Sequence, residues 1–431
     1  MTFSEQVKTK LTSIIHEMNA VSWMYSKNPD SDFSRNRKMN FESTIRFILS
    51  MESNSLKKEL LEFFRFSENT PSASAFSQCR NKLLIDAFKY LFTEFNSRFE
   101  YQHNYKGYQL LACDGSDLNI SVNPQDEDTY FQSQPTDRGY NQMHLNALFD
   151  LCNKRYVDAD IQPARKENEI MSMTKMVDRY SGESKTIFIA DRGYESYNTF
   201  AHIQEKGMYY LIRVKDGTAG GITRSLELPK TEEFDYNFKL SLINRISEQQ
   251  DDDTFYRLYK KNTFDYLSSE NHSYTLDLRV VRFAITENSY EMIITNLPQE
   301  DFLMDEIKSL YAMRWGIETS FRELKYAIGL TCFHSKKVDY IEQEIYARMI
   351  LYNYCEIITM HVVIKQNDTK HVYQLNFTIA IHICRYFLQN DIDPPSVEKL
   401  IQKNLLPIRP ERSNPRKVKR KSVVSFLYRV S

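Results

Sequence analysis

The amino-acid sequence predicts a mixed α/β (α+β) fold, in which an all-helical N-terminal domain precedes a core of strands and helices. Two observations predict it. Apolar residues in the first hundred positions recur at the spacing of one helix face, whereas after position 100 they gather in short runs typical of strands. The 431 residues, 42% hydrophobic and 26% charged, have the composition of a globular protein with room for two or three packed units.

The same periodicity divides the chain into five segments. Phe41, Ile45 and Ile48 mark a helix face in the first segment, and the runs at 108–113 and 186–190 are strand-like in the second. In order, we expect a helical domain at 1–100, the first part of the core at 101–215, a β-rich insertion at 216–300, the last part of the core at 301–365, and a C-terminal helical region with a basic tail at 366–431.

Charge is balanced over the whole chain but not along it. With 56 Lys and Arg against 57 Asp and Glu, the net charge is −1, so an anionic partner would be held only by regional charge. Residues 409–421 carry seven basic side chains and one acid, which is typical of a tail that binds a polyanion. Residues 231–253 are rich in acids and are expected to avoid nucleic acid.

Other features of the sequence argue against several classes of protein. The 11 glycines form no phosphate-binding Gly-rich loop, and the six cysteines form no Cys-x-x-Cys pair for zinc or redox chemistry. The first residues lack the apolar stretch of a signal peptide, and the most apolar long stretch is interrupted by polar and charged residues. We therefore expect a cytoplasmic protein without a membrane span.

Two aspartates follow strand-like runs, Asp114 in the sequence LLACDGS and Asp191 in TIFIADRG. A carboxylate at the end of a buried strand is expensive to desolvate unless it is paired or holds a cation, so this position is typical of metal and catalytic sites. The alternative is that each aspartate caps a helix or starts a turn.

A third acid lies in the helical stretch LYAMRWGIETSFRELKYAIGL. At about 100° per residue, Tyr311, Arg314, Glu318 and Lys325 fall on one stripe only about 60° wide, so all four can face one ligand. The alternative is a solvated helix face on which Arg314 and Glu318 form an ordinary i,i+4 pair, worth a few tenths of a kcal/mol.

Taken together, these residues resemble the bacterial DDE transposases of the insertion-sequence-four family. That family carries Tyr-x2-Arg-x3-Glu-x6-Lys on the helix of its last catalytic acid, and Tyr311, Arg314, Glu318 and Lys325 match this spacing. The Asp-Gly-Ser that starts at Asp114 and the Asp-Arg-Gly that starts at Asp191 are similar to the contexts of the first two acids. A long β-rich insertion precedes the third acid, and 127 positions separate Asp191 from Glu318 here.

The resemblance implies a ribonuclease-H-like mixed-sheet catalytic core and a DNA transposase that works by cut and paste. Asp114, Asp191 and Glu318 would be both catalytic residues and ligands of two Mg²⁺ ions, with Mn²⁺ as substitute, because oxygen ligands suit either ion. Water would cut the strand at the element's end, a hairpin would form, and the 3′-hydroxyl would join the target. The implied partners are double-stranded DNA, as terminal inverted repeats and target, and a second copy in a synaptic homodimer; no membrane or small-molecule substrate is expected, and the protein would associate with the bacterial nucleoid.

Further residues are DNA-binding candidates within this resemblance. Tyr311, Arg314 and Lys325 could hold backbone phosphates without reading sequence. Arg213 and Lys215 lie where the family often has basic DNA contacts, although solvated strand-end charges would look the same. Arginines and lysines in the 1–100 domain could recognise the terminal repeats. The tryptophan on which relatives stack a flipped base has no counterpart in the insertion, because the chain has only two tryptophans, at 23 and 315.

Two other functions remain open at this point. A catalytically silent, transposase-derived regulator would bind the same DNA without cutting it. A metal-dependent nuclease with the same core would cut DNA without strand transfer. His144 could likewise approach the acids from a neighbouring strand or be an ordinary hydrogen-bonded core histidine.

Overall fold

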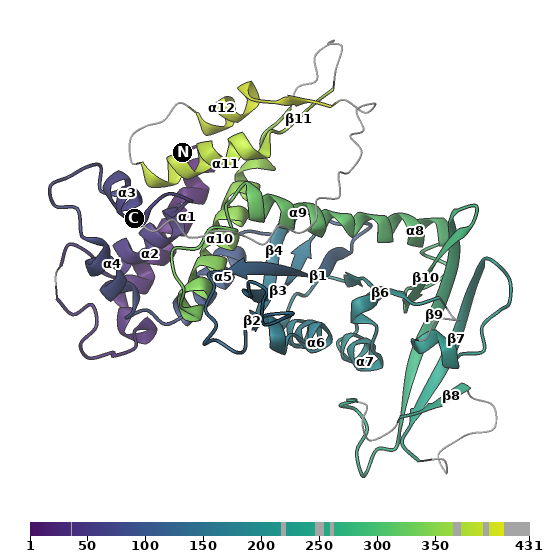
Figure 1. Cartoon of the computed structure of the whole chain (residues 1–431). Coiled ribbons are helices and arrows are strands. Elements are labelled where there is room, and N and C mark those ends of the chain that lie inside the picture. The colour runs from purple at the N-terminus through teal and green to yellow at the C-terminus, as the bar shows by residue number, and fades with distance from the viewer. Residues whose placement is uncertain are drawn as a thin grey trace.

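A computed structural model of the whole chain (Figure 1) describes residues 1–35, 37–216, 221–245, 254–258, 263–364, 372–390 and 396–408. It has the predicted mixed α/β fold. The basic tail at 409–421 and part of the acidic stretch at 231–253 lie outside the described residues.

Helices make up the N-terminal region, as the apolar spacing predicts. The first helix begins at a capping box, in which the Thr2 hydroxyl and the Glu5 carboxylate each accept a main-chain N–H of the other residue. The second buries Phe41, Ile45 and Ile48, the face that the spacing marks. The elements are α1 (Phe3–Ala20), η1 (Ser22–Tyr25), α2 (Phe41–Ser50), α3 (Leu56–Phe63), α4 (Ala73–Arg80) and α5 (Asp86–Ser97).

The core is a mixed sheet with the ribonuclease-H-like strand order β4-β3-β1-β5-β6. Three antiparallel strands come first and two strands parallel to the first follow, because helical crossovers join β4 to β5 and β5 to β6. All five residues of β5 are buried, as expected for a central strand covered on both faces. The strands are β1 (Gln109–Ile120), β2 (Tyr130–Phe131), β3 (Tyr140–Asp150), β4 (Arg155–Pro163), β5 (Thr186–Ala190) and β6 (Tyr209–Val214).

Different helices cover the two faces of this sheet (Figure 1). Leu111 and Cys113 of β1 pack on the side of the crossover helices α6 (Glu169–Arg179) and α7 (Tyr197–Glu205). Ala112 packs on the opposite side, with helices that follow the insertion. Since side chains alternate along a strand, Asp114 shares the face of Ala112, and Gly115 shares the face of the crossover helices.

The β-rich stretch extends the same sheet instead of forming a separate one. Strand β10 pairs with β6, and β9 and β7 continue outward from it (Figure 1). These strands are β7 (Phe234–Ile243), β8 (Thr254–Arg257), β9 (Ser273–Thr286) and β10 (Ser289–Thr295). The last part of the core therefore returns to the sheet from its far edge.

The helical stretch that carries the third acid is divided in two at Arg314, where the sequence predicts one helix. Figure 1 shows the two parts, α8 (Met304–Met313) and α9 (Trp315–Tyr326), nearly in line along one side of the sheet. Arg314 keeps helical backbone angles, φ −50° and ψ −33°, so the break preserves the direction of the stripe.

One long helix, α10 (Val338–Thr359), joins the core to the N-terminal helices. It is buried on almost every side and packs on α5, α2, α11 and β4. Among the helices described, none has the length and apolarity to cross a membrane. The remaining elements are η2 (Ala164–Lys166), η3 (Arg192–Tyr194), η4 (Ile222–Ser225), β11 (Tyr373–Gln374), α11 (Phe377–Gln389), α12 (Val397–Lys403) and β12 (Leu406–Pro407).

Candidate active site

The sheet register brings the two aspartates side by side. Parallel strands β1 and β5 pair as far as Cys113 and Ala190, so Asp114 and Asp191 are the next residues on neighbouring strands. The Asp114 carboxylate accepts the N–H of Gly115 at 2.9 Å, and the Asp191 carboxylate accepts the N–H of Gly193 at 2.8 Å. Asp191 thereby caps η3, as the capping alternative predicts. The pairing of β1 with β5 also places it beside Asp114.

The prediction that Asp114 follows a strand is wrong in one respect. Strand β1 continues through it to Ile120, because antiparallel pairing with β3 extends to Ile120 and Asn141. What ends before Asp114 is the parallel pairing with β5. Asp114 is therefore paired with β3 on one side of β1, whereas on the other side β5 has already ended.

Helix α9 adds the third acid through a buried arginine. Arg314 is 6% exposed and donates from Nη2 to Glu318 Oε1 at 2.8 Å, and its Nη1 lies 3.5 Å from Asp114 Oδ2. The Arg314–Glu318 pair therefore exists, with the arginine buried against β1 and the Glu318 side chain 39% exposed. The guanidinium bridges two acids that are 204 positions apart, since 318 − 114 = 204.

The concentration of acids changes the protonation of Asp114. Burial raises its pKa to about 6, and the negative charges of Asp191 and Glu318 add to the increase. Arg314 and the Gly115 N–H oppose this rise without cancelling it. A cation bound beside Asp114 would favour its ionised form and offset this penalty.

Three more acids surround His144 on the face of the crossover helices. Its Nδ1 lies 2.9 Å from Asp117 Oδ1 and 3.1 Å from Glu167 Oε2, and its Nε2 lies 3.2 Å from Glu169 Oε1. Although burial alone would lower it, the pKa of His144 is raised to about 9 by the hydrogen bonds to Asp117 and Glu169 and the neighbouring charges. Atoms of Asp117, His144 and Glu167 are close enough to ligate one ion. His144 is therefore a buried, hydrogen-bonded histidine, and its ring also lies beside Gly115, the residue after Asp114.

These acids do not stand out in the sequence. Glu167 and Glu169 lie in the polar connection KENE before α6, a pattern shared with any helix start. Only the alternation along β1, which turns Gly115 and Asp117 to the side of α6, could have pointed to them.

The predicted DNA-binding residues differ in their contacts. The Tyr311 ring is buried, and its hydroxyl has no hydrogen-bond partner within the described part of the chain. Lys325 Nζ donates to the main-chain oxygen of Asp117 at 2.8 Å. Arg213 lies 3.3 Å from Glu291 on the neighbouring strand, and Lys215 is exposed. The structure thus brings Arg314 and Lys325 to Asp114 and Asp117 of β1 and the Tyr311 ring beside Arg314, whereas Arg213 and Lys215 lie at the end of β6.

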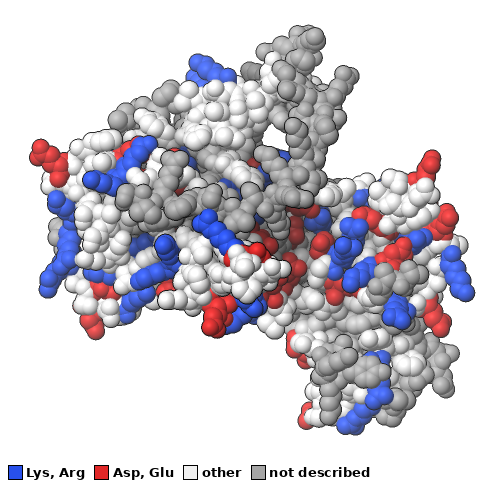
Figure 2. Space-filling view, viewed as in Figure 1, with Lys and Arg blue, Asp and Glu red and all other residues white. Residues whose placement is uncertain are grey.

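The surface agrees with this arrangement. Figure 2 shows Asp and Glu side chains gathered in the middle of the face, over the region where Figure 1 places the central strands between α6 and α9. Lys and Arg side chains lie on both sides of it. A polyanion could be held at the flanks while its backbone meets the acids.

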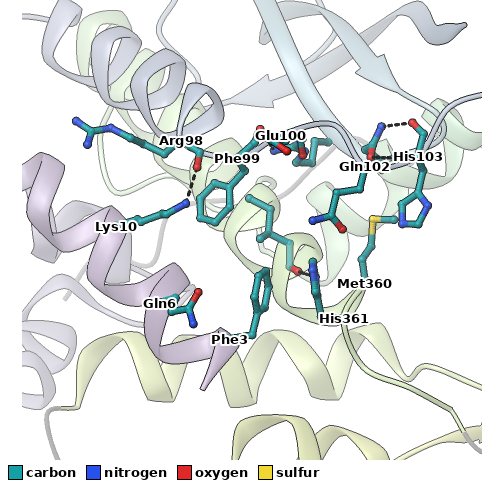
Figure 3. Close-up of a pocket in the computed structure, with 13 residues that line it drawn as sticks. Phe3, Gln6, Lys10, Arg98, Phe99, Glu100, Gln102, His103, Met360 and His361 are labelled. Carbon is teal, nitrogen blue, oxygen red and sulfur yellow. Dashed lines mark hydrogen bonds between the residues drawn. The ribbon is translucent and has the colours of Figure 1, made fainter. Parts of the chain in front are cut away.

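A separate cavity of about 270 Å³ lies at the other end of the sheet (Figure 3). It lies between α1, the segment after α5 and the end of α10, and Lys10 donates there to the main-chain oxygen of Arg98 at 2.7 Å. Its lining includes none of the predicted site residues.

The carboxylates fit a hard divalent cation. Asp114, Asp191 and Glu318 offer oxygen donors only, the set that Mg²⁺ and Mn²⁺ prefer. Burial, and then the acidic neighbours, raise the pKa of Asp114. A cation between these carboxylates would favour the ionised form of Asp114 and lower its pKa.

Comparison with known proteins identifies the family. The family model described as "Transposase DDE domain" matches residues 105–354, which is 250 of the 431 residues. The chain belongs to the transposase DDE domain family. The match includes β1, β5 and α9, so all three predicted acids of this transposase lie within it.

This transposase was also compared with solved structures and with curated proteins. A cryo-EM structure of the piggyBac transposase synaptic complex with hairpin DNA aligns with a TM-score of 0.44 and 11% identity, over 92% of this chain and 84% of that chain. Among curated proteins, none matches the sequence.

Proposed function

We propose that this transposase is an active enzyme of the insertion-sequence-four type, which moves its element by cut and paste. One observation carries the proposal: Asp114 and Asp191 lie side by side on the sheet, and the buried Arg314 links Asp114 to Glu318 of α9. Three carboxylates on three elements are a costly arrangement unless they bind a cation together. A silent regulator has no need of them.

Asp114, Asp191 and Glu318 would hold two Mg²⁺ ions, or Mn²⁺ in their place. When bound, such ions supply Lewis-acid stabilisation of the attacking and leaving oxygens at a phosphodiester. Arg314 fixes the separation of Asp114 and Glu318 by its two hydrogen bonds. Tyr311 and Lys325, on the same stripe, would donate to phosphates next to the scissile one, and Arg213 and Lys215 would hold DNA further along β6.

The proposed reaction is a series of displacements at phosphorus. Water breaks the phosphodiester at the element's end and leaves a 3′-hydroxyl on one strand. That hydroxyl attacks the opposite strand, so that a hairpin forms and the flanking DNA leaves, and a second water reopens the hairpin. The released 3′-hydroxyl then attacks target DNA, forming one phosphodiester for each one it breaks.

The proposed partners follow from this chemistry. Double-stranded DNA would enter both as terminal inverted repeats and as target, and two copies of the chain would synapse two ends. The helical domain at 1–100 would recognise the repeats. The segments at 101–215 and 301–365 would form the catalytic core around the insertion at 216–300. The tail of the 366–431 region would add phosphate contacts. Such a protein would act at the bacterial nucleoid.

The test is end cleavage by purified full-length protein on labelled duplexes that carry the sequences flanking its own gene. We expect nicks, hairpins and joined products with Mg²⁺ and none with chelator. Glu318→Gln should reduce cleavage at least about a hundredfold, because one ligand of the metal site is lost. Glu323→Gln is the matched control, since Glu323 lies on the same helix but accepts from Tyr352 at 3.0 Å.

Each contrary outcome has a definite meaning. Equal cleavage by Glu318→Gln and wild type would remove Glu318 from the site. Binding of ends without cleavage in Mg²⁺ and in Mn²⁺ would identify a silent regulator. Cleavage without joined products would identify a nuclease.

A further inference from the structure

We propose that Glu169, at the start of α6, is a fourth carboxylate of the metal site, and the proposal rests on the function proposed above. Glu169 is not part of the sequence pattern that links Asp114, Asp191 and Glu318. Its carboxylate lies on the face of the sheet opposite to α9, beside Gly115 and Gly193, the glycines that closely follow the two aspartates in the sequence. The inference rests on the space around two glycines and on one histidine.

The first glycine shows how close Glu169 comes to strand β1, on the face opposite to the Asp114 side chain. A Cβ added at Gly115 would lie 2.5 Å from Glu169 Oε1 and 2.5 Å from His144 Nε2. Gly115 has an ordinary backbone conformation, so a larger residue is excluded by these side chains and not by strain. A side chain at position 115 would therefore displace the Glu169 carboxylate or the His144 ring.

The second glycine places the other oxygen of the same carboxylate near Asp191. A Cβ added at Gly193 would lie 3.0 Å from Glu169 Oε2 and 3.1 Å from Asp191 Oδ1. The two carboxylate oxygens therefore flank one small volume above Gly193. The carboxylate thus reaches β1 at Gly115, next to Asp114 in the sequence, with Oε1, and approaches Asp191 with Oε2.

His144 holds this carboxylate in place. Its Nε2 lies 3.2 Å from Glu169 Oε1, while its Nδ1 is occupied by Asp117 and Glu167. The ring is buried, with 6% exposure, so the contact is fixed on the strand β3 scaffold. Glu169 Oε2 has no such partner among the described residues and points to Asp191, where a cation would be shared.

Glu167 serves as an internal control for this inference. It carries the same charge two positions earlier and contacts the same histidine, with 3.1 Å between Oε2 and Nδ1. Neither Gly115 nor Gly193 has Glu167 among its close neighbours. A site shared with Asp191 needs Glu169, whereas a site made of Asp117, His144 and Glu167 needs Glu167.

The experiment measures Mn²⁺ binding to the full-length protein by calorimetry, alongside metal-dependent end cleavage and the melting temperature without metal. Glu169→Gln should weaken Mn²⁺ binding by about tenfold or more and slow cleavage, with the metal-free melting temperature unchanged or higher. Glu167→Gln should stay within about twofold of wild type in both. Gly115→Ala should weaken Mn²⁺ binding like Glu169→Gln, because the added methyl displaces the carboxylate.

The outcomes separate this inference from the proposed function. If Asp114→Asn and Glu318→Gln bind Mn²⁺ as wild type does, the metal site of the proposed function is wrong and the inference fails with it. If those variants lose binding while Glu169→Gln retains it, the inference alone is overturned. A loss in Glu167→Gln equal to that in Glu169→Gln would place the ion at Asp117, His144 and Glu167 instead and would also overturn it.

Discussion

Two groups of charges in this molecule differ in how far the protein compensates their acids. In the α4–α10 charge network, Arg80, Glu344, His334 and Glu59, the acids are matched by protein cations. In the acidic cluster, Asp114, Asp191, Glu318 and Glu169, the acids outnumber the cations near them. The first group joins the N-terminal helices to the core, and the second lies where the catalytic acids are predicted.

The details show how complete the compensation is in the network. Glu344 is fully buried, accepts from Arg80 Nη1 at 2.8 Å, and lies 3.4 Å from His334 Nδ1. His334 Nε2 is 3.3 Å from Glu59, whose carboxylate also accepts the N–H groups of Glu52 and Asn54. Although burial alone would raise it, the pKa of Glu344 is lowered to about 2 by Arg80 and His334. By contrast, the pKa of Asp114 is raised to about 6, first by burial.

This difference separates a charge cluster that stabilises the fold from one that binds a cation. Where the protein supplies the partners, the charged form of the acid is favoured and the cluster stabilises the fold. Where the partners are insufficient, the acids destabilise the fold until a cation arrives.

The largest effect is expected from Glu344→Gln. Removal of this charge leaves Arg80 buried without its carboxylate, and a broken buried ion pair costs about 3 to 5 kcal/mol of unfolding free energy. Urea unfolding of the full chain measures it. The control is Glu342→Gln on the same helix, whose pKa is raised by burial and whose removal should cost little. A loss below about 1 kcal/mol for Glu344→Gln would contradict the contrast.

The next effect is a pH dependence of stability. The pKa of His334 is raised to about 9 in the folded chain, since Glu344 and Glu59 outweigh the opposing effect of burial, against about 6.5 when unfolded. The folded state therefore binds the proton more tightly, so the stabilisation is complete below pH 6.5 and is lost as the pH rises through 9, up to about 3 kcal/mol in total. His144 titrates in the same window. In His334→Gln the slope of unfolding free energy between pH 6.5 and 9 should fall by roughly half, and an unchanged slope would exclude His334.

A smaller effect of opposite sign is expected at Asp114. Its folded pKa of about 6 lies above the unfolded value near 4, so the ionised form is disfavoured and stability is lost as the pH rises from 4 through 6. At pH 8 without divalent ions, Asp114→Asn should raise the unfolding free energy by about 1 to 2 kcal/mol. Mn²⁺ should stabilise the wild type and not this variant. Destabilisation by Asp114→Asn would place Asp114 with the compensated network.

Much of the fold and of the acid triad follows from local patterns. The run TIFIA predicts a buried strand, and it is β5; the spacing of Tyr311, Arg314 and Glu318 predicts one face, and a buried Arg314 lies there between two acids. These features depend on residues close in sequence, whose periodicity reports directly which side is buried. The roles of these residues stay predictions.

What the sequence could not supply depends on how elements dock. Glu169 reaches Gly115 and Asp191 because α6 packs on η3, β3 and β4, and no short pattern encodes that packing. The continuation of β1 past Asp114 depends on its antiparallel partner β3, which starts 20 residues further on, since 140 − 120 = 20. The break between α8 and α9 falls at Arg314, two residues before Gly316, where a Cβ would lie 2.8 Å from Leu151, so the break depends on how α9 packs on the end of β3.

The smallest effect is expected at the border of the acidic cluster, from Lys325→Ala. Lys325 Nζ donates to the main-chain oxygen of Asp117, so its positive charge is held beside the acids by a neutral group. If it contacts one DNA phosphate, its removal should reduce the slope of log affinity against log salt concentration by about 0.9, with little effect on Mn²⁺ binding. End binding measured at several salt concentrations gives the slope, and Lys399→Ala, an exposed lysine of α12, is the control. A variant with the wild-type slope but weakened Mn²⁺ binding would make Lys325 a support of the acids instead, and the line between the acidic cluster and its DNA-binding border would have to be redrawn.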